Sequence, residues 1–158
     1  FGRTGGVMEA ALRTAAYLIT GTTLPIEATD CTAATPEEPW TSKTLDVGGM
    51  EVRIAIASGL ENASKLLDAL AADEVEFDFV EVMACPGGCV GGGGQPIAFN
   101  QELAKERAAV LNALDGADVL RMSHENPDVQ KLYADWIGEP LSPTAEAWLH
   151  TDQLAWDI

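Results

Sequence analysis

Two cysteines four residues apart are the residues of this sequence best placed to do chemistry. Cys85 and Cys89 lie in the stretch 81–96, which also holds six of the fifteen glycines. Thiolates are the usual protein ligands of iron–sulfur clusters, and glycines let backbone N–H groups approach the cluster sulfur atoms. The apolar run 77–83 leads into this stretch as a strand would. The pattern indicates a metal-cluster loop; the alternatives are a glycine-rich turn with two buried cysteines, or a disulfide.

The third cysteine does not fit the same site. Cys31 lies in a segment rich in Thr, Pro and Glu, beside Asp30 and before Glu37 and Glu38. Nearby carboxylates raise the pKa of a thiol, which disfavours a ligand or a reactive nucleophile. A [4Fe–4S] cluster needs four ligands, ordinarily thiolates, and this chain supplies two that are well placed. We therefore expect that the chain alone binds no stable cluster and catalyses nothing.

Three segments resemble one known family. Residues 81–96 fill every fixed position of E-x-M-A-C-P-x-G-C-x-x-G-G-G-Q-P, the third cluster-binding signature of the iron-only ([FeFe]) hydrogenases. Residues 1–13 resemble that family's F-G-x-T-G-G-V-M-E-A segment. Similarity to the family's closing stretch is found in residues 121–127, 132–133 and 149–151. By this resemblance, residues 1–158 are the C-terminal part of the catalytic domain, and the N-terminal part is absent.

The resemblance also implies a function and a cofactor. In that family protons are reversibly reduced to hydrogen at the H-cluster, a [4Fe–4S] cube joined to a diiron unit with CO, CN and dithiolate ligands. The resemblance implies that Cys85 and Cys89 are metal ligands. Cys89 would bridge the two parts of the H-cluster and Met83 would line the diiron unit, so the implied catalytic residues are Cys89 and Met83. The implied cofactor-binding residues are Phe1, Gly2, Val7 and Met83. The two missing cysteines would come from the N-terminal part or a second chain, and electrons from a protein such as ferredoxin or from an NAD(P)-linked unit.

Simpler interpretations of several residues remain open. Met83 could be an ordinary core methionine, and His124 and His150 are better explained as structural residues than as catalytic ones. Loop N–H groups before the first helix favour an anionic ligand, although small residues packed on a sheet would explain the same sequence. The alternatives for the whole chain are an iron–sulfur assembly factor, a hydrogen sensor of the same fold, or a structural subunit without metal. Assembly factors resemble M-A-C-P-S-G-C-x-N-G-G-G-Q, in which a serine stands where this chain has glycine.

The charge and composition of the chain argue against several classes of binding partner. Twenty-five acidic against nine basic residues give a formal charge of −16, which argues against nucleic acid and against an anionic membrane surface. No run reaches the roughly 18 apolar residues of a membrane span. Three cysteines, two of them in a cluster motif, do not form a disulfide framework. A reducing, cytoplasmic location fits, and a periplasmic one stays open.

Hydrophobic periodicity predicts an α/β fold around a parallel βαβ core with flanking helices. We expect a helix over 7–20, a surface loop over 22–44 and a hairpin with strands 45–47 and 50–57. In the second of these strands Val52, Ile54 and Ile56 should form the buried face of a half-exposed strand. Helix 62–70, burying Leu66, Leu67 and Leu70, should then cross over to a parallel strand over 77–83.

The remainder should be helical. A helix with a charged outer face is expected over 101–114, and another over 127–137 in the C-terminal tail 121–158. We expect four large side chains of the tail to anchor it on the body of the protein: Trp136, Leu141, Trp148 and Leu149.

Overall fold

The computed structural model describes residues 1–31, 38–97 and 102–150, which divide into two compact units, Phe1–Val119 and Leu120–Ile158. The first unit contains α1 (Gly6–Thr20), α2 (Ile26–Thr29), β1 (Thr41–Val47), β2 (Met50–Ser58), α3 (Leu60–Ala71), β3 (Phe79–Met83), the 3₁₀ turn η1 (Cys89–Gly91) and α4 (Ala104–Ala117). The second contains η2 (Ser123–Glu125), α5 (Pro127–Leu132), the π-helical turn η3 (Tyr133–Ile137) and α6 (Pro143–Leu149). Within these residues, no helix has both the length and the apolar composition of a membrane span.

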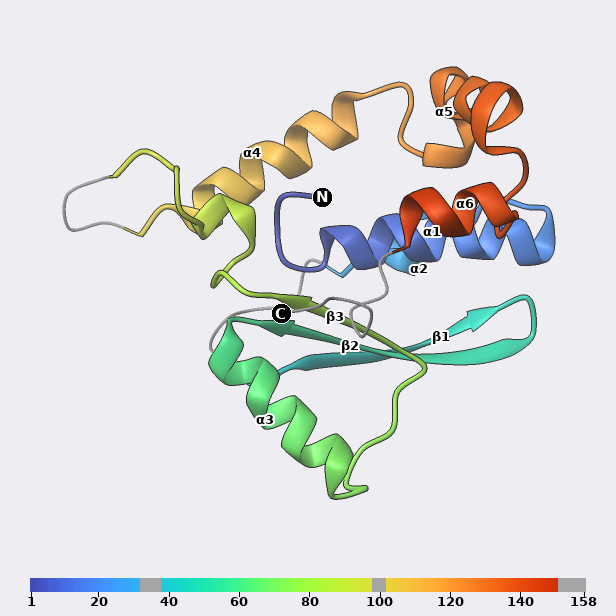
Figure 1. Ribbon diagram of the computed structural model, residues 1–158. Coiled ribbons are helices and arrows are strands. Elements are labelled where there is room, and N and C mark those ends of the chain that lie inside the picture. Colours follow the sequence, from blue (N-terminus) through green and yellow to red (C-terminus); the bar gives the residue numbers. More distant parts are fainter. Residues whose placement is uncertain (32–37, 98–101, 151–158) are drawn as a thin grey trace. The chain divides into compact units, whose positions relative to one another are not determined.

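The three strands form one mixed sheet in the order β1-β2-β3 (Figure 1). β1 and β2 are an antiparallel hairpin whose turn residues, Gly48 and Gly49, have φ of 64° and 87°. Positive φ at both central positions suits the twist of a hairpin and favours glycine. β2 and β3 are parallel, with Ile54 opposite Phe79 and Ser58 opposite Met83. The predicted βαβ core is therefore confirmed, with α3 as the crossover helix.

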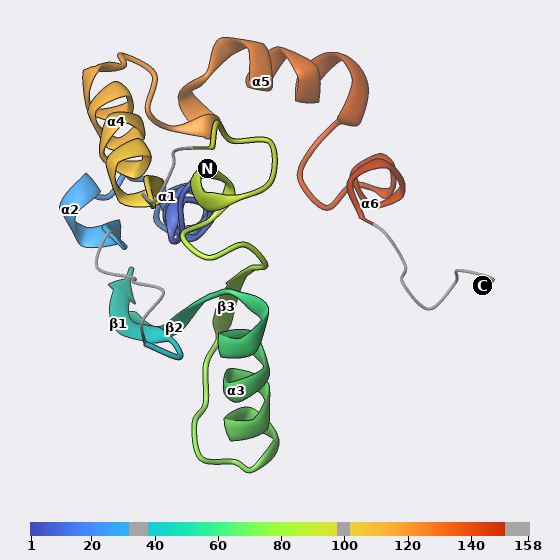
Figure 2. The same ribbon diagram turned by 90° about the vertical axis from the view of Figure 1, so that its left-hand side faces the viewer.

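Helices cover both faces of β2. On one face, Met8, Leu12 and Ala16 of α1 belong to a core with strand residues that include Ile54 and Ile56. On the other face, Leu66 of α3 packs with alanines 55 and 57. Figures 1 and 2 show α1 and α3 on opposite sides of the sheet. The prediction of a half-exposed strand is wrong from Ile54 to Ser58, because every residue there is buried.

Two helices show which predictions from the hydrophobic periodicity of the sequence hold and which do not. α1 ends, as predicted, at Gly21, whose φ of 70° lets its N–H bond to the carbonyl of Tyr17. In α3 Leu66 is buried and Leu70 partly buried, but Leu67 is 62% exposed. Adjacent helical residues point about 100° apart, so Leu66 and Leu67 cannot both face the sheet. Ala63 and Ala69 complete the buried face instead.

The segment 22–44, predicted as a surface loop, has more structure than a loop. It includes the short helix α2 and the first residues of β1, while residues 32–37 lie outside the described residues. Thr29 and Cys31 are buried, at 1% and 5% exposed. Cys31 belongs to the core on the α1 face of the sheet, and the Thr29 hydroxyl accepts from Arg13 of α1 at 3.3 Å.

In the second unit, α5 begins where the Asn126–Pro127 pair predicts. The Asn126 side chain accepts a hydrogen bond from the N–H of Asp128, a helix N-cap. Four large apolar side chains of this unit are each more than half exposed: Trp136, Leu141, Trp148 and Leu149. They therefore contribute little to packing within the unit, and their role as anchors stays a prediction.

Candidate metal centre

The cysteine loop, residues 84–97, leaves the carboxyl end of β3 beside the N-terminus and α4 (Figures 1 and 2). Cys85 and Cys89 are both exposed and neither is in a disulfide. The alternatives of a buried cysteine pair and of a disulfide are therefore wrong. Ligand-binding loops of open α/β sheets lie at this end of the strands, so the position is suited to a bound group.

Backbone turns of the cysteine loop leave the two thiols exposed. The Cys85 carbonyl accepts from the N–H of Gly88 at 2.9 Å, and the Cys89 carbonyl accepts from the N–H of Gly92 at 3.1 Å. The Gln95 side chain also donates to the Cys89 carbonyl at 3.1 Å. A Cβ added at Gly92 would lie 3.2 Å from the Cys85 sulfur, so this glycine keeps the space beside that thiol open.

The donor set fits half of a cubane cluster. Two exposed thiolates beside open glycine backbone are suited to iron, a metal for which thiolate is a far better ligand than a hydroxyl. Across residues 1–31, 38–97 and 102–150, no group of three or more His, Cys, Asp or Glu side chains could hold a metal ion. Completing four ligands thus requires groups that these residues do not supply.

The N-terminal segment packs directly on the cysteine loop. The N–H of Thr4 donates to the Gly87 carbonyl at 3.1 Å, and the N–H of Val90 donates to the Gly2 carbonyl at 3.0 Å. Gly88, with φ of 90°, lies between them: an added Cβ would come within 2.8 Å of the Arg3 backbone and of the Met83 sulfur. The fold therefore brings together two of the three sequence segments that carry the family resemblance, residues 1–13 and 81–96.

The predicted cofactor-binding residues lie around this junction. Gly2 is bonded to the cysteine loop through its carbonyl, and Met83 lies against Gly88 and is partly buried. Phe1 is 75% exposed and Val7 is 41% exposed, so both side chains are accessible to a bound group. His124 and His150 belong to the second unit; the Nδ1 atom of His150 lies 3.5 Å from the Glu146 carboxylate.

Ser58 holds the same junction from the end of β2. Its hydroxyl oxygen accepts from the N–H of Gly87 at 2.8 Å and from the Thr4 hydroxyl at 3.2 Å. The next residue, Gly59, donates to the Met83 carbonyl at 2.7 Å. Sequence reasoning missed Ser58. The available signal was a serine that ends an apolar strand, directly before a helix and opposite Met83 in the parallel register.

Glu81 corrects the prediction about the helix N-terminus. Its carboxylate, on β3 and 7% exposed, accepts from the N–H of Gly5 at 2.7 Å and from the N–H of Met8 at 2.6 Å. Orphan N–H groups and the helix dipole favour an anion there, as predicted. The anion is the chain's own carboxylate, so these two donors are not free for a ligand.

A buried ion cluster continues from this point. Glu9 accepts from Arg3 at 2.6 Å, from Arg13 at 3.3 Å and from the N–H of Cys31 at 2.7 Å. Arg3, Glu9 and Arg13 are each less than a tenth exposed. Glu9 is thus paired with two buried cations, which is how a buried charge is tolerated.

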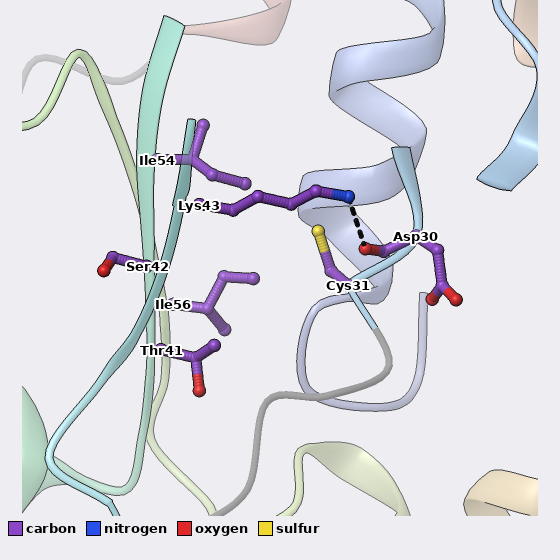
Figure 3. A pocket seen from close by; sticks show the side chains of 7 residues that line it. All are labelled: Asp30, Cys31, Thr41, Ser42, Lys43, Ile54 and Ile56. Carbon is purple, nitrogen blue, oxygen red and sulfur yellow. Dashed lines mark hydrogen bonds between the residues drawn. The ribbon is translucent and has the colours of Figure 1, made fainter. Parts of the chain in front are cut away.

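Cys31 lies in a different environment from the other two cysteines. Burial raises the pKa of its thiol to about 11, and the Glu9 carboxylate adds to the shift. The predicted direction is confirmed, but the main cause is burial rather than the neighbouring acids of its own segment. Figure 3 shows Cys31 in a pocket beside Lys43 and over Ile54 and Ile56 of β2, where its thiol is inert packing.

Comparison with known proteins adds independent information. Residues 1–93 match the family described as iron only hydrogenase large subunit, C-terminal domain, and residues 101–152 match iron hydrogenase small subunit. The NADP-reducing hydrogenase subunit HndD of Solidesulfovibrio fructosivorans is 47% identical over 152 residues, which are 96% of this chain and 26% of that protein. Protein NAR1 of Arabidopsis thaliana is 30% identical over 155 residues, covering 95% of this chain and 32% of the relative.

A solved structure shows the same fold. An apo [FeFe]-hydrogenase from Chlamydomonas reinhardtii superposes with a TM-score of 0.68 at 40% identity, covering 92% of this chain and 43% of that one. This chain spans roughly a quarter to a third of the length of the curated relatives it matches.

Proposed function

The chain belongs to the family of iron-only hydrogenase large subunits, through their C-terminal domain, and we propose from this that it forms part of a hydrogenase catalytic site. The reaction is the reversible reduction of protons to hydrogen. The observation that supports it most directly is the pair of exposed thiols, Cys85 and Cys89, in a glycine loop braced by residues 1–6. The exposed pair and its brace lie in the part of the chain that matches the large-subunit family.

Cys85 and Cys89 would hold a [4Fe–4S] cube, and Cys89 would also connect the cube to a diiron unit with CO, CN and dithiolate ligands. When bound, this group would relay electrons to or from the electron partner and provide the metal centre at which hydrogen forms or is split. The chain's own residues orient and enclose it. Met83 would offer an apolar thioether wall that excludes water without taking up a proton, and Phe1, Gly2 and Val7 would also contact the group.

The remaining ligands would come from residues beyond this chain, in the same polypeptide or in a second subunit. Two apolar side chains support a covering partner, because they remain exposed: Val7 in the first turn of α1 at 41%, and Val82, next to Met83, at 48%. The electron partner would be a ferredoxin or an NAD(P)-linked unit. The name of the relative from Solidesulfovibrio fructosivorans supports the second choice.

An iron–sulfur assembly factor is the second candidate, since relatives of that kind also match. The serine of the assembly-factor signature aligns with Gly87. Here Gly87 has φ of 81°, and an added Cβ would lie 3.0 Å from the Cβ of Ala104. A side chain at this position would strain the loop, so the local geometry favours the glycine-containing hydrogenase loop.

Infrared and electron paramagnetic resonance spectroscopy of the anaerobically purified holoprotein distinguish the two. A hydrogenase shows CO and CN stretching bands, a cube signal and hydrogen turnover. A cube signal without those bands and without turnover would assign the chain to the assembly factors and overturn the proposal. As a companion test, residues 1–158 reconstituted alone with iron and sulfide should retain no intact cube, because only two well-placed thiolates are present.

A further inference from the structure

Arg107 binds both ends of the glycine stretch that follows Cys89. Its Nη1 donates to the Val90 carbonyl at 3.0 Å, and its Nη2 donates to the Pro96 carbonyl at 2.6 Å. The two acceptors are six residues apart and enclose Gly91–Gly94 and Gln95. A planar guanidinium with several N–H donors can bridge two carbonyls in this way.

The helix that carries Arg107 is packed against the cysteine loop. A Cβ added at Gly91 would lie 3.2 Å from the Cβ of Ala104, and a Cβ added at Gly2 would lie 3.1 Å from a methyl group of Leu111. Arg3 also donates to the Asn112 side chain at 2.5 Å. One face of α4 therefore contacts the cysteine loop through Ala104 and Arg107, and the N-terminal segment through Leu111 and Asn112.

The glycine stretch needs such a brace. Four consecutive glycines lose more backbone entropy on ordering than any other residues, and they have no side chains to pack. The loop's own bonds from Gly92 and Gln95 converge on the Cys89 carbonyl. Arg107 adds the contact that ties the far end, Pro96, back to the residue next to Cys89.

We propose that Arg107 is a positioning residue for the Cys89 thiolate, acting by clamping the glycine stretch between Val90 and Pro96. The effect of Arg107 on a bound cluster rests on the proposed function, whereas its effect on the loop does not. The clamp also joins the two parts of the chain that match different families, because α4 falls within residues 101–152 and Cys89 within residues 1–93. In addition, the guanidinium places a positive charge close to the cluster loop, which favours the reduced, more negative state of a bound cluster.

Three variants of the holoenzyme test the proposal. Arg107→Lys keeps the charge and the aliphatic stem but loses the two-carbonyl fork, and Arg107→Met loses both charge and fork. Lys105→Met is the matched control, because Lys105 lies on the same helix and is exposed. Circular dichroism confirms that each variant is folded.

The first readout is hydrogen exchange of the Gly91 and Gly92 amides, which bond to the Gly88 and Cys89 carbonyls, in the metal-free protein. Both Arg107 variants should exchange roughly tenfold faster than the wild type, the effect of losing charge-assisted hydrogen bonds at a partly exposed site. The second readout is the cluster itself. Both variants should alter its electron paramagnetic resonance line shape, and Arg107→Met should in addition lower its reduction potential. Lys105→Met should change neither readout.

Each contrary result overturns the inference. Unchanged exchange in both Arg107 variants would show that the fork does not hold the loop. Faster exchange with an unchanged line shape and potential would limit Arg107 to loop stability and remove its role at Cys89. Failure of the proposed function would look different: the wild type would lack the CO and CN bands, while the exchange measurement would still report on the clamp.

Discussion

The exposed cysteines and the buried cysteine are held by opposite kinds of interaction. Cys85 and Cys89 are exposed, and their loop is braced by a hydrogen bond to the Ser58 hydroxyl and by hydrogen bonds from Arg107. Cys31, in contrast, is 5% exposed in an apolar cluster, and only its backbone N–H joins the buried ions. The difference separates a thiol that is kept available to a ligand from a thiol that fills space.

Glu81 and Glu9 connect these two regions. Both carboxylates are buried, both bind backbone N–H groups, and both belong to segments that resemble the hydrogenase family. One joins β3 to the start of α1, and the other joins α1 to Cys31. The exposed site thus depends on a rigid polar interior, so substitutions in that interior should alter the conformation of the cysteine loop.

The largest contrast is expected from serine substitutions in the holoenzyme. Cys89→Ser should lower hydrogen turnover by at least roughly 100-fold, because a hydroxyl is a much poorer ligand for iron than a thiolate. Cys31→Ser should leave turnover and iron content near those of the wild type. Measured hydrogen evolution and iron counts check both variants. Turnover well above a trace in Cys89→Ser, or its loss in Cys31→Ser, would contradict the assignment.

Removing the carboxylate that joins strand and helix should have the next largest effect. Glu81→Ala leaves the N–H groups of Gly5 and Met8 buried without an acceptor, and the free energy of unfolding should fall by about 3 kcal/mol. Urea denaturation of the metal-free protein measures it. Glu61→Ala is the control, since its carboxylate also lies at the N-terminal end of a helix but its side chain is 84% exposed. An equal loss of unfolding free energy in the two variants would contradict a specific role for the Glu81 carboxylate.

Two glycines of the cysteine loop allow a sharper comparison. Gly88→Ala should destabilise the metal-free protein by about 2 kcal/mol, because the new Cβ meets the Arg3 backbone and the Met83 sulfur at positive φ. Gly93→Ala should be nearly neutral, since no atom lies within 4 Å of its added Cβ. Thermal unfolding of both variants is the measurement. A harmless Gly88→Ala would show that the two segments are not in tight contact.

The smallest effect concerns the pH dependence of Cys31. Its pKa rises from an ordinary value of 9.0 to about 11 in the folded protein. Between these values the unfolded chain releases the proton and the folded chain keeps it, so stability should fall as pH rises from about 9 to 11 and be unaffected by this group below 9.

Alkylation followed by mass spectrometry checks the same shift. In the metal-free protein, Cys85 and Cys89 should react with iodoacetamide at about pH 8 because they are exposed, whereas Cys31 should stay unmodified. Urea-unfolded protein, in which all three react, is the control. Labelling of Cys31 at the same rate as the other two would show that the thiol is not enclosed.

The local sequence was sufficient for the elements with strong periodicity or a turn signal. It predicted α1 and its end at Gly21, the Gly48–Gly49 hairpin, the parallel pairing of β2 with β3 and the start of α5 at Pro127. The resemblance to a cluster-binding signature also singled out Cys85 and Cys89, which are exposed and not in a disulfide; their role as ligands stays a proposal. These inferences hold because backbone preferences and the spacing of thiols are properties of neighbouring residues.

Only the tertiary structure decided which residues support the site. The orientation of α3 on the sheet decides that Leu66 faces the sheet and that Leu67 faces solvent. Ser58 binds the Thr4 hydroxyl and Glu81 binds the Gly5 N–H only because folding joins residues more than 50 positions apart. A polar side chain has the same sequence signature whether it is solvated or buried against an N–H group. Its role appears only when folding brings its partner within hydrogen-bonding distance.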